Sequence, residues 1–362
     1  MHHLIDTTDL TMGELQEIID LALDIIADRP KYRRACTDKT IATLFYEPST
    51  RTRLSFESAM IELGGSVIGF SDASTSSVTK GETISDTIKV INSFADIIAM
   101  RHPSDGVPLV ASMVSNVPII NGGDGSHCHP TQTLADLLTI KREVGRMDNL
   151  VVGLCGDLKF GRTVHSLATA MMRHPGTKFV FISPPQLDMP SNMKRQMEAA
   201  GIPFREVEDM ESVMGELDVL YMTRVQKERF YNPAEYERLK DVYILNTEKL
   251  KKAKAKMAIL HPLPRVNEIT KEVDDDPRAA YFRQVENGKF MRMALILKLF
   301  EWKGSNKLNP QLEGVMVNPE GLKCPNPRCI SSIENVDQLI RPVNPAEGKY
   351  RCAYCDTTVR KP

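Results

Sequence analysis

A run of hydroxyl and guanidinium side chains at residues 47–53 is the strongest chemical signal in this 362-residue sequence. The run reads Glu-Pro-Ser-Thr-Arg-Thr-Arg and separates an apolar strand-like segment at 40–46 from apolar residues at helical spacing over 56–63. It therefore occupies a helix N-terminus, where backbone N–H groups and the helix dipole favour an anion. Arginine also matches phosphate oxygens two at a time. A helix cap followed by exposed arginines is the alternative, but the combination favours a phosphate site formed by Ser49, Thr50, Arg51, Thr52 and Arg53.

Further polar side chains follow other strand-like runs in the first half of the chain. Lys80 lies in a hydroxyl-rich loop at 76–83, which a solvated surface loop would explain equally well. Arg101 comes directly after the apolar run 97–100. His129 and Gln132 enter a predicted helix after a glycine-rich turn. His129 could be an ordinary cap residue, but its placement also suits a donor that polarises a carbonyl group.

The second half repeats the arrangement with side chains suited to carboxylates. Arg162 opens a predicted helix after the strand-like run 150–155, and Arg224 follows the run 218–223, with Arg229 close behind. Two prolines around Leu263 stiffen the chain and leave carbonyl groups free to accept hydrogen bonds. We find no nucleophilic triad and no carboxylate pair in the sequence. The residues therefore predict transfer from a phosphorylated acyl-type donor to an anionic nucleophile, driven by positioning and electrostatics.

Four of the seven cysteines fall within the last 39 residues, as two close pairs. Four thiolates in this spacing suit a tetrahedral, fully protein-ligated structural zinc ion. The segment is too small and polar to bury a core, so a metal would supply folding energy. Two disulfides would do the same in an oxidising compartment. In a reducing one the spacing predicts one structural Zn²⁺ per chain, held by Cys324, Cys329, Cys352 and Cys355.

The elements that must position these residues alternate along the chain. Alternating strands and helices predict an α/β fold with two parallel-sheet domains, which place ligands beyond the carboxyl ends of their strands. A small zinc domain follows at 321–362. Strand-like runs lie at 40–46, 66–70, 95–100, 117–120, 150–155, 178–183, 218–223 and 256–260, and helical patterns at 11–28, 84–94, 131–144, 162–173, 190–200 and 288–303.

Composition gives little support to other classes of function. With 46 basic and 47 acidic residues the chain is nearly neutral, which argues against dedicated binding to nucleic acid or an anionic membrane. The N-terminus lacks a secretory pattern, and no apolar stretch is long enough to span a bilayer. We therefore expect a cytoplasmic protein without a membrane partner.

Residues 1 to about 304 closely resemble an aspartate carbamoyltransferase catalytic chain. The resemblance rests on the Ser-Thr-Arg-Thr-Arg run, Lys-Gly-Glu at 80–82, Met-Arg-His-Pro at 100–103, Gly123 to Thr133, Gly156 to Ser166, Tyr221 to Arg229 and His-Pro-Leu-Pro-Arg at 261–265. Ornithine carbamoyltransferases share the first motif but typically carry His-Cys-Leu-Pro in place of residues 261–264. That enzyme is retained as the alternative.

The resemblance implies a role for each matching residue, with no organic cofactor and no general base. Thr52, Arg101 and His129 would polarise the carbonyl oxygen while the aspartate amine attacks. Ser76 and Lys80 would enter the active site of a neighbouring subunit in a homotrimer, although the adjacent Ser77 leaves that register open. The carbamoyl phosphate site would comprise Ser49, Thr50, Arg51, Thr52, Ser76, Lys80, Arg101, His129, Gln132, Leu263 and Pro264, and the aspartate site Lys80, Arg162, Arg224 and Gln226.

The resemblance also implies the division into domains. Residues 1–134 would bind carbamoyl phosphate and 135–287 would bind aspartate. A last helix at 288–304 would return to the first domain, and 305–320 would form a linker. Residues 321–362 resemble the zinc domain of the aspartate carbamoyltransferase regulatory chain, through Cys-x₄-Cys and Cys-x₂-Cys separated by 22 residues.

The fused tail is expected to act as a structural brace on the catalytic trimer or between trimers. Residues 302–323 cannot hold the nucleotide-binding domain that precedes this zinc domain in the regulatory chain. We therefore expect no control by ATP or CTP through that route. Small zinc modules also bind nucleic acid. Here seven basic residues face four acidic ones, and Tyr350 and Tyr354 are the two aromatics, which favours the brace.

Overall fold

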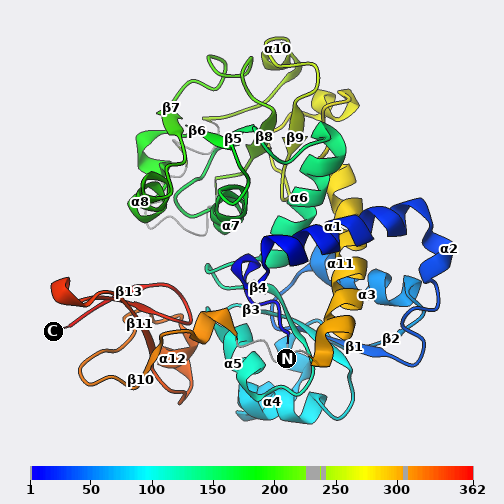
Figure 1. Cartoon of the computed structure of the whole chain (residues 1–362), viewed down its shortest axis with the longest axis vertical. Coiled ribbons are helices and arrows are strands. Elements are labelled where there is room, and N and C mark those ends of the chain that lie inside the picture. Colours follow the sequence, from blue (N-terminus) through cyan, green and yellow to red (C-terminus); the bar gives the residue numbers. More distant parts are fainter. Residues whose placement is uncertain (1, 226–236, 238–241, 305–308, 362) are drawn as a thin grey trace. The chain divides into compact units, whose positions relative to one another are not determined.

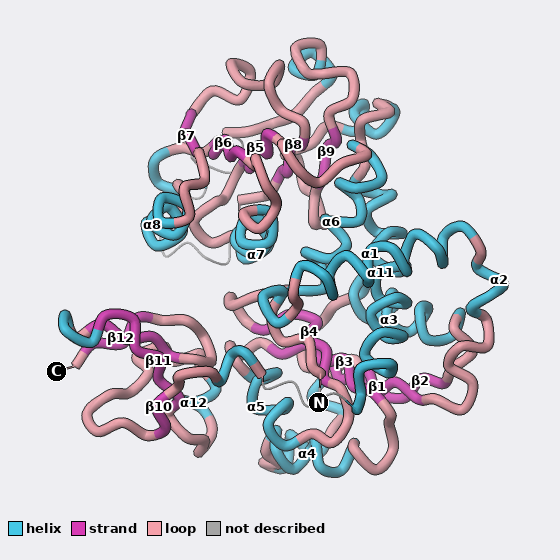
Figure 2. Tube along the Cα trace, in the orientation of Figure 1, coloured by secondary structure: helices cyan, strands magenta, loops and turns pink. Residues whose placement is uncertain are grey.

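The computed structural model describes residues 2–225, 237, 242–304 and 309–361 (Figures 1 and 2). Its contacts divide the chain into two compact units. Unit 1 comprises Met1–Thr131 together with Lys289–Pro362, and unit 2 comprises Gln132–Gly288. Both passages between the units lie at helices, α6 (Pro130–Val144) and α11 (Tyr281–Glu301). Among the described residues, no helix is long and apolar enough to cross a membrane.

A parallel sheet with strand order β2-β1-β3-β4 forms the centre of unit 1. Its central strands are almost continuously buried, as expected for parallel strands with both faces covered. Figure 1 shows α3 and α11 on one side of this sheet and α4 and α5 on the other. The elements are β1 (Thr40–Phe45), β2 (Ser66–Phe70), β3 (Ile97–His102), β4 (Ile119–Asp124), α1 (Met12–Ala27), α2 (Arg29–Tyr32), α3 (Thr50–Glu62), α4 (Ile84–Ile91) and α5 (Val107–Val114).

Unit 2 contains a second parallel sheet, with strand order β7-β6-β5-β8-β9. In both units the polar segments of interest follow the carboxyl ends of strands, which meet at one edge of a parallel sheet. The elements are β5 (Val151–Cys155), β6 (Lys178–Ile182), β7 (Phe204–Val207), β8 (Val219–Met222), β9 (Ala258–Leu260), α7 (Arg162–Met171), α8 (Ser191–Ala199) and α10 (Thr247–Leu250).

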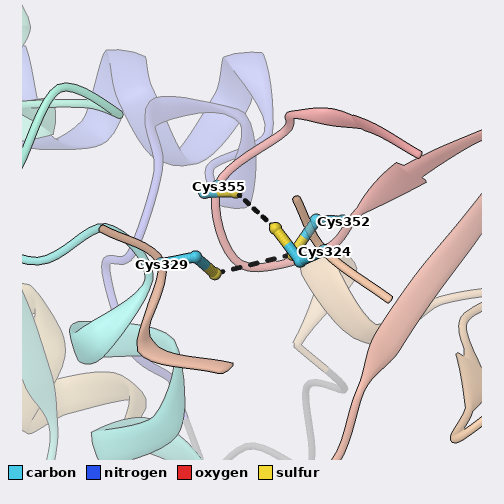
Figure 3. A group of neighbouring side chains, drawn as sticks. All are labelled: Cys324, Cys329, Cys352 and Cys355. Atoms are coloured by element: carbon cyan, nitrogen blue, oxygen red, sulfur yellow. Dashed lines mark hydrogen bonds between the residues drawn. The ribbon is translucent and has the colours of Figure 1, made fainter. Parts of the chain in front are cut away.

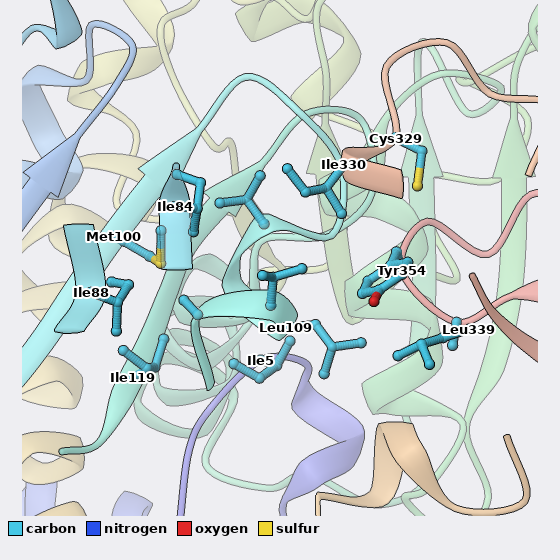
Figure 4. Close-up of a cluster of buried hydrophobic side chains, with 14 of the residues drawn as sticks. Ile5, Ile84, Ile88, Met100, Leu109, Ile119, Cys329, Ile330, Leu339 and Tyr354 are labelled. Atoms are coloured by element: carbon cyan, nitrogen blue, oxygen red, sulfur yellow. The ribbon is translucent and has the colours of Figure 1, made fainter. Parts of the chain in front are cut away.

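The C-terminal tail folds into an antiparallel sheet in the order β10-β11-β12-β13. Its core is continuous with the core of unit 1, because Ile330, Leu339 and Tyr354 belong to the same buried cluster as Ile84 and Leu109 (Figure 4). Its elements are β10 (Met316–Val317), α12 (Ile330–Ile333), β11 (Leu339–Asn344), β12 (Lys349–Cys352) and β13 (Thr358–Arg360), so β10 begins within the segment expected to be a linker.

Among the elements that differ from the sequence-based expectation, three have a clear physical reason. The last helix begins at Tyr281 rather than at residue 288, because the buried Gly288 interrupts the apolar spacing without ending the helix. Strand β7 was not predicted, since charged side chains occupy its middle. Helix α5 was also missed, because Gly106 and Pro108 resemble a turn, yet Pro108 is at a helix start, where proline is tolerated.

Candidate functional site

The Ser-Thr-Arg-Thr-Arg run forms the first turn of α3, directly beyond the end of β1. Ser49 is the N-cap residue, and within the described chain its side chain makes no capping hydrogen bond. Thr52 is buried on the inner face, whereas Thr50 and Arg51 are exposed. The backbone of this edge is held in place by a hydrogen bond from Tyr46 N to the carbonyl oxygen of Arg101, 2.9 Å away. The turn therefore presents backbone N–H groups and hydroxyls on a fixed support.

Two guanidinium groups concentrate positive charge beside this turn. Although Arg51 as a whole is exposed, partial burial of its guanidinium group and, to a lesser degree, the charge of Arg101 lower the pKa of Arg51. The Arg101 side chain is oriented by Glu47, whose Oε1 accepts a hydrogen bond from Nε at 2.7 Å. An anion placed between the arginines would relieve their repulsion, as a phosphate site requires. Glu47 was not predicted as a site residue, although it is the first residue of the motif.

His129 lies against the same turn, with Nε2 3.5 Å from Oγ1 of Thr52. Its side chain is 5% exposed. The preceding loop is anchored by Asp124 at the end of β4, which accepts hydrogen bonds from Gly106 N (2.8 Å) and Cys128 N (3.3 Å). Thr52 and His129 thus converge on one point from two elements, as carbonyl polarisation requires.

Asp124, His127 and Cys128 form a second group close enough to hold a metal ion. Their polar atoms already have partners within the protein. Asp124 contacts His127 Nδ1 at 3.0 Å, and the Cys128 thiol donates to the carbonyl oxygen of Ile5 at 3.3 Å. Burial alone would raise the pKa of Asp124, but the neighbouring His127 holds it below its usual value. We therefore infer that these three residues have a structural role: they hold the loop that precedes His129.

Ser76 and Lys80 lie on a separate loop of unit 1. The Ser76 hydroxyl donates to the carbonyl oxygen of Ala73 at 2.8 Å, and Lys80 is exposed at the end of a short 3-10 helix, Ser77–Lys80. In the described chain, no hydrogen bond or ion pair joins Lys80 to the Thr52–His129 group. The assignment of Ser76 and Lys80 to the site therefore stays a prediction.

In unit 2, Gln132 belongs to a buried chain of hydrogen bonds. Its amide donates to Oδ1 of Asp136 at 2.7 Å, and Gln284 donates to the same oxygen at 2.6 Å. Gln284 in turn accepts from His261 N at 3.0 Å. Asp136 and Gln284 were not predicted; the i,i+4 spacing of Gln132 and Asp136 was the available signal for one of them.

The segment containing Leu263 and Pro264 is held in place by the side chain of His261. Its Nδ1 accepts a hydrogen bond from Leu263 N at 2.8 Å, so Nε2 carries the proton and donates to Glu268 at 2.7 Å. Burial would raise the pKa of Glu268, but hydrogen bonding to His261 lowers it below its usual value. Leu263 adopts a positive φ of 53° before a cis peptide bond to Pro264.

The two arginines expected to bind carboxylates follow neighbouring strands of the unit 2 sheet. Arg162 is the first residue of α7, after β5, and Arg224 follows β8, which pairs with β5. Both side chains are half-buried. The loops are tied together where Asp157 N donates to Oγ1 of Thr223 at 3.0 Å. Gln226 and Arg229 lie outside the described residues.

The four cysteines of the tail converge in the structure (Figure 3). Sulfur–sulfur distances are 3.5 Å for Cys324–Cys355 and 3.7 Å for Cys329–Cys352. These distances exclude disulfide bonds of about 2.05 Å. They approach the edge of about 3.8 Å expected for a tetrahedron with zinc–sulfur bonds of about 2.3 Å. The residues therefore fit a tetrahedral thiolate-bound metal ion.

Comparisons with protein families divide the chain into three parts. Residues 2–142 match the carbamoyl-P binding domain of aspartate/ornithine carbamoyltransferases, and residues 148–299 match their Asp/Orn binding domain. Residues 311–362 match the metal binding domain of the aspartate carbamoyltransferase regulatory chain. The first two matches together span more than half of the chain.

Individual relatives agree with this division. The chain is 59% identical over 300 residues to an aspartate carbamoyltransferase catalytic subunit from Lachnoclostridium phytofermentans, covering 83% of this chain and 98% of the relative. It is 60% identical over 297 residues to that of Clostridium acetobutylicum, covering 82% and 97%. The catalytic subunit of M. jannaschii aspartate transcarbamoylase superposes with a TM-score of 0.79 at 48% identity, covering 84% and 100%. Trypanosoma cruzi aspartate transcarbamoylase, solved with carbamoyl phosphate and aspartate, gives a TM-score of 0.76 at 37% identity, covering 82% and 95%.

Proposed function

Because the chain belongs to the aspartate/ornithine carbamoyltransferase family, with aspartate carbamoyltransferase catalytic subunits among its relatives, we propose how its own residues perform the reaction. The enzyme transfers the carbamoyl group of carbamoyl phosphate to the amine of L-aspartate. The products are N-carbamoyl-L-aspartate and phosphate, an early step of de novo pyrimidine synthesis. The observation that carries the proposal is the convergence of Thr52 and His129 beside the paired Arg51 and Arg101.

The first turn of α3 binds the phosphate group of the donor. Ser49, Thr50 and Thr52 supply hydroxyls and backbone N–H groups, and Arg51 supplies a bidentate cation. Arg101 bridges the phosphate and the carbonyl oxygen. Burial and the charge of Arg101 lower the pKa of Arg51, and a bound anion offsets both effects.

Carbamoyl transfer proceeds by attack of the aspartate nitrogen on the carbonyl carbon. A carbon–nitrogen bond forms, the carbon–oxygen bond to phosphate breaks, and the leaving phosphate accepts the amine proton. Thr52, Arg101 and His129 stabilise the negative charge that develops on the carbonyl oxygen. The carbamoyl NH₂ donates to Gln132 and to the carbonyl groups of Leu263 and Pro264.

Aspartate is bound through its carboxylates by Arg162 and Arg224, with Gln226 and Lys80 completing the set. Support comes from the half-buried positions of both arginines after paired strands. Arginine suits this task because its planar fork meets both oxygens of a carboxylate. The same feature disfavours ornithine, whose side chain ends in an ammonium group.

Lys80, together with Ser76 or Ser77, acts in the site of a neighbouring subunit of a homotrimer. The exposure of Lys80 on its own loop supports this arrangement. Lys80→Ala and Arg51→Ala chains should each be inactive, whereas trimers reassembled from a mixture should regain part of the activity through sites with neither change. Mixed trimers with no recovered activity would show that each chain completes its own site.

In the tail, Cys324, Cys329, Cys352 and Cys355 hold one Zn²⁺. A thiolate-bound zinc ion supplies folding energy and has no vacant position for chemistry. Metal analysis of the purified chain should return one zinc per chain, and one metal lost in Cys355→Ser.

The proposal is tested by offering purified protein carbamoyl phosphate together with equal L-aspartate and L-ornithine. We expect carbamoyl-aspartate and phosphate in equal amounts. Citrulline as the main product would show that the 261–265 segment has been misinterpreted. Absence of both products from folded, metal-loaded protein would refute the enzyme assignment.

A further inference from the structure

Residues 326–330 of the tail, around Cys329, contact the part of unit 1 that supports His129. The segment around Cys329 lies alongside Asp105, where Asp105 N donates to the carbonyl oxygen of Arg328 and Ile330 N donates to that of Asp105, both at 3.0 Å. The side chain of Asn326 also donates to Oδ2 of Asp105 at 2.8 Å. Asp105 therefore shares three hydrogen bonds with the tail.

The same carboxylate holds the loop that carries His129. Oδ1 of Asp105 accepts a hydrogen bond from Ser126 N at 2.6 Å, and Arg328 Nη2 reaches Oγ of Ser126 at 3.4 Å. Asp105 is only 2% exposed, so the hydrogen bond from Ser126 N to its carboxylate is partly shielded from water, whereas the contact between Arg328 and Ser126 is exposed. The loop packs closely here, because a Cβ on Gly125 would come within 2.0 Å of Asp105 Oδ1. A continuous path of contacts thus runs from Asn326 through Asp105 to Ser126, three residues before His129.

A second contact reaches the loop that carries Lys80. The carboxylate of Glu334, just after α12, accepts from Ile84 N at 3.2 and 3.3 Å. Ile84 is the first residue of α4, and the Lys80 loop ends at its N-cap residue, Thr83. A carboxylate at this position meets an otherwise open N–H group and the positive end of the helix dipole. Glu334 therefore anchors the point where the loop joins the helix.

The core explains why these contacts hold together. Ile330 and Tyr354 from the tail are buried in one cluster with Ile84 and Leu109 (Figure 4). Gly106 approaches Tyr354 so closely that a Cβ on the glycine would lie 2.4 Å from Tyr354 Cβ. A closely packed interface transmits displacement rather than absorbing it. The tail is therefore part of the same packed body as the two loops.

We propose that the metal-binding tail is a positioning element of the active site. Through Asn326 and Asp105 it fixes the loop of His129, and through Glu334 it fixes the start of the helix that follows the Lys80 loop. Asp105, Asn326 and Glu334 are positioning residues, because they act through residues that touch the substrate. This inference rests on the proposed roles of His129 and Lys80.

Two single substitutions in the full-length protein test the proposal separately. In Asn326→Ala we expect kcat to fall about three- to tenfold, the effect of one lost hydrogen bond, with little change in the KM for aspartate. Hydrogen exchange at Ser126 to His129 should accelerate by a similar factor. In Glu334→Ala we expect KM for both substrates to rise more than kcat falls, because Lys80 is proposed to bind both. Glu334→Gln keeps an acceptor oxygen and should restore most of the loss.

Matched controls come from the same module. Asn335→Ala and Glu347→Gln change an exposed amide and an exposed carboxylate and should behave as the unchanged protein. Metal content is measured for every variant, and if Asn326→Ala binds less metal, Asp105→Asn replaces it. The inference would be overturned if the protein without substitutions is active and metal-replete Asn326→Ala and Glu334→Ala show the same kcat, KM and hydrogen exchange as that protein. An inactive unchanged protein would instead refute the proposed function.

Discussion

The first turn of α3, proposed to bind phosphate, and the four-cysteine cluster both lie in unit 1, but they gather different charges: guanidinium groups at the turn and thiols in the cluster. The turn gathers positive groups, and partial burial together with the nearby charge of Arg101 lowers the pKa of Arg51. The cluster gathers thiols whose spacing already fits a tetrahedral ion. In the proposed function, the turn binds a substrate that is released after each reaction, whereas the cluster holds a structural ion that remains bound. On this proposal, one compact unit contains both a site for substrate turnover and a site for a permanently bound structural ion.

The two regions also differ in how they are supported. The turn depends on neighbours from several segments, including Glu47, His129 and the loop at 124–129. The cluster draws all four sulfurs from the tail. If the tail supports the His129 loop as proposed, the four-cysteine cluster stabilises the substrate site proposed beside the α3 turn. The following predictions test that dependence, from the largest expected effect to the smallest.

Removing the metal should produce the largest effect. Apparent binding free energies of structural zinc are about 10–16 kcal/mol, and much of that energy is folding energy. Because the tail shares its core with α4 and α5, we expect metal removal to lower the thermal unfolding temperature of unit 1, not of the tail alone. Calorimetry with and without a chelator measures this. An unchanged main transition beside one lost minor transition would show that the two regions are independent.

Removing the cation at the turn should affect catalysis without affecting the fold. Arg51→Ala eliminates a bidentate phosphate contact, and loss of one such electrostatic group costs about 10²–10³ in rate. Arg33→Ala, which removes an exposed guanidinium elsewhere in unit 1, should leave the rate unchanged. Steady-state kinetics and metal content are measured together. Full turnover in Arg51→Ala would remove the turn from the mechanism.

A methyl group added at the contact between the two regions should have an intermediate effect. Gly125 has a φ of +43°, and a Cβ would meet Asp105. Gly125→Ala should lower the free energy of unfolding by about 1–3 kcal/mol and slow catalysis. Gly314→Ala also introduces alanine at positive φ, 66°, but in open space, so it should cost less and leave catalysis alone. Equal losses of stability and of rate in both variants would mean that backbone strain, not the contact with Asp105, causes the effect of Gly125→Ala.

The smallest predicted effect is a difference in pH dependence between the units. In unit 1, burial raises the pKa of Asp9 to about 6, so its contribution to stability is full below pH 4 and is lost as pH rises through 6. In unit 2, the lowered pKa of Glu268 has the opposite sign, so its contribution is present above about pH 4.5 and is lost in more acidic solution. Denaturant unfolding is measured between pH 3 and 8 for the unsubstituted protein, Asp9→Asn and Glu268→Gln. The difference in the free energy of unfolding between the unsubstituted protein and each variant should change with pH in opposite directions for the two positions. Parallel pH curves for the unchanged protein and Asp9→Asn would refute the first.

Sequence patterns predicted the helices and strands better than they predicted the buried polar residues that hold those elements in place. Continuous apolar runs such as 40–45 predicted buried parallel strands, and the hydroxyl run predicted where α3 begins. Strand β7 escaped because its charged residues suit an exposed edge. The cysteine spacing was sufficient to predict the cluster, since a metal site of this kind depends on few residues.

The supports were missed because they have meaning only in three dimensions. Asp105, Asp136 and Gln284 are ordinary polar residues in the sequence, and only burial beside a specific partner gives each a task. Asp105 and Asn326 are separated by 221 positions, so no local pattern could connect them. Buried polar partners of this kind are set by tertiary contact rather than by spacing.

The most direct test of the central claim is the rate of carbamoyl-aspartate formation by the full chain as the metal is removed and restored. We expect the rate to fall in step with metal loss, to recover when Zn²⁺ is added back, and to be matched by faster and then slower hydrogen exchange at Ser126 to His129. A metal-free chain that stays folded and keeps its full rate would contradict the claim that the tail positions the active site.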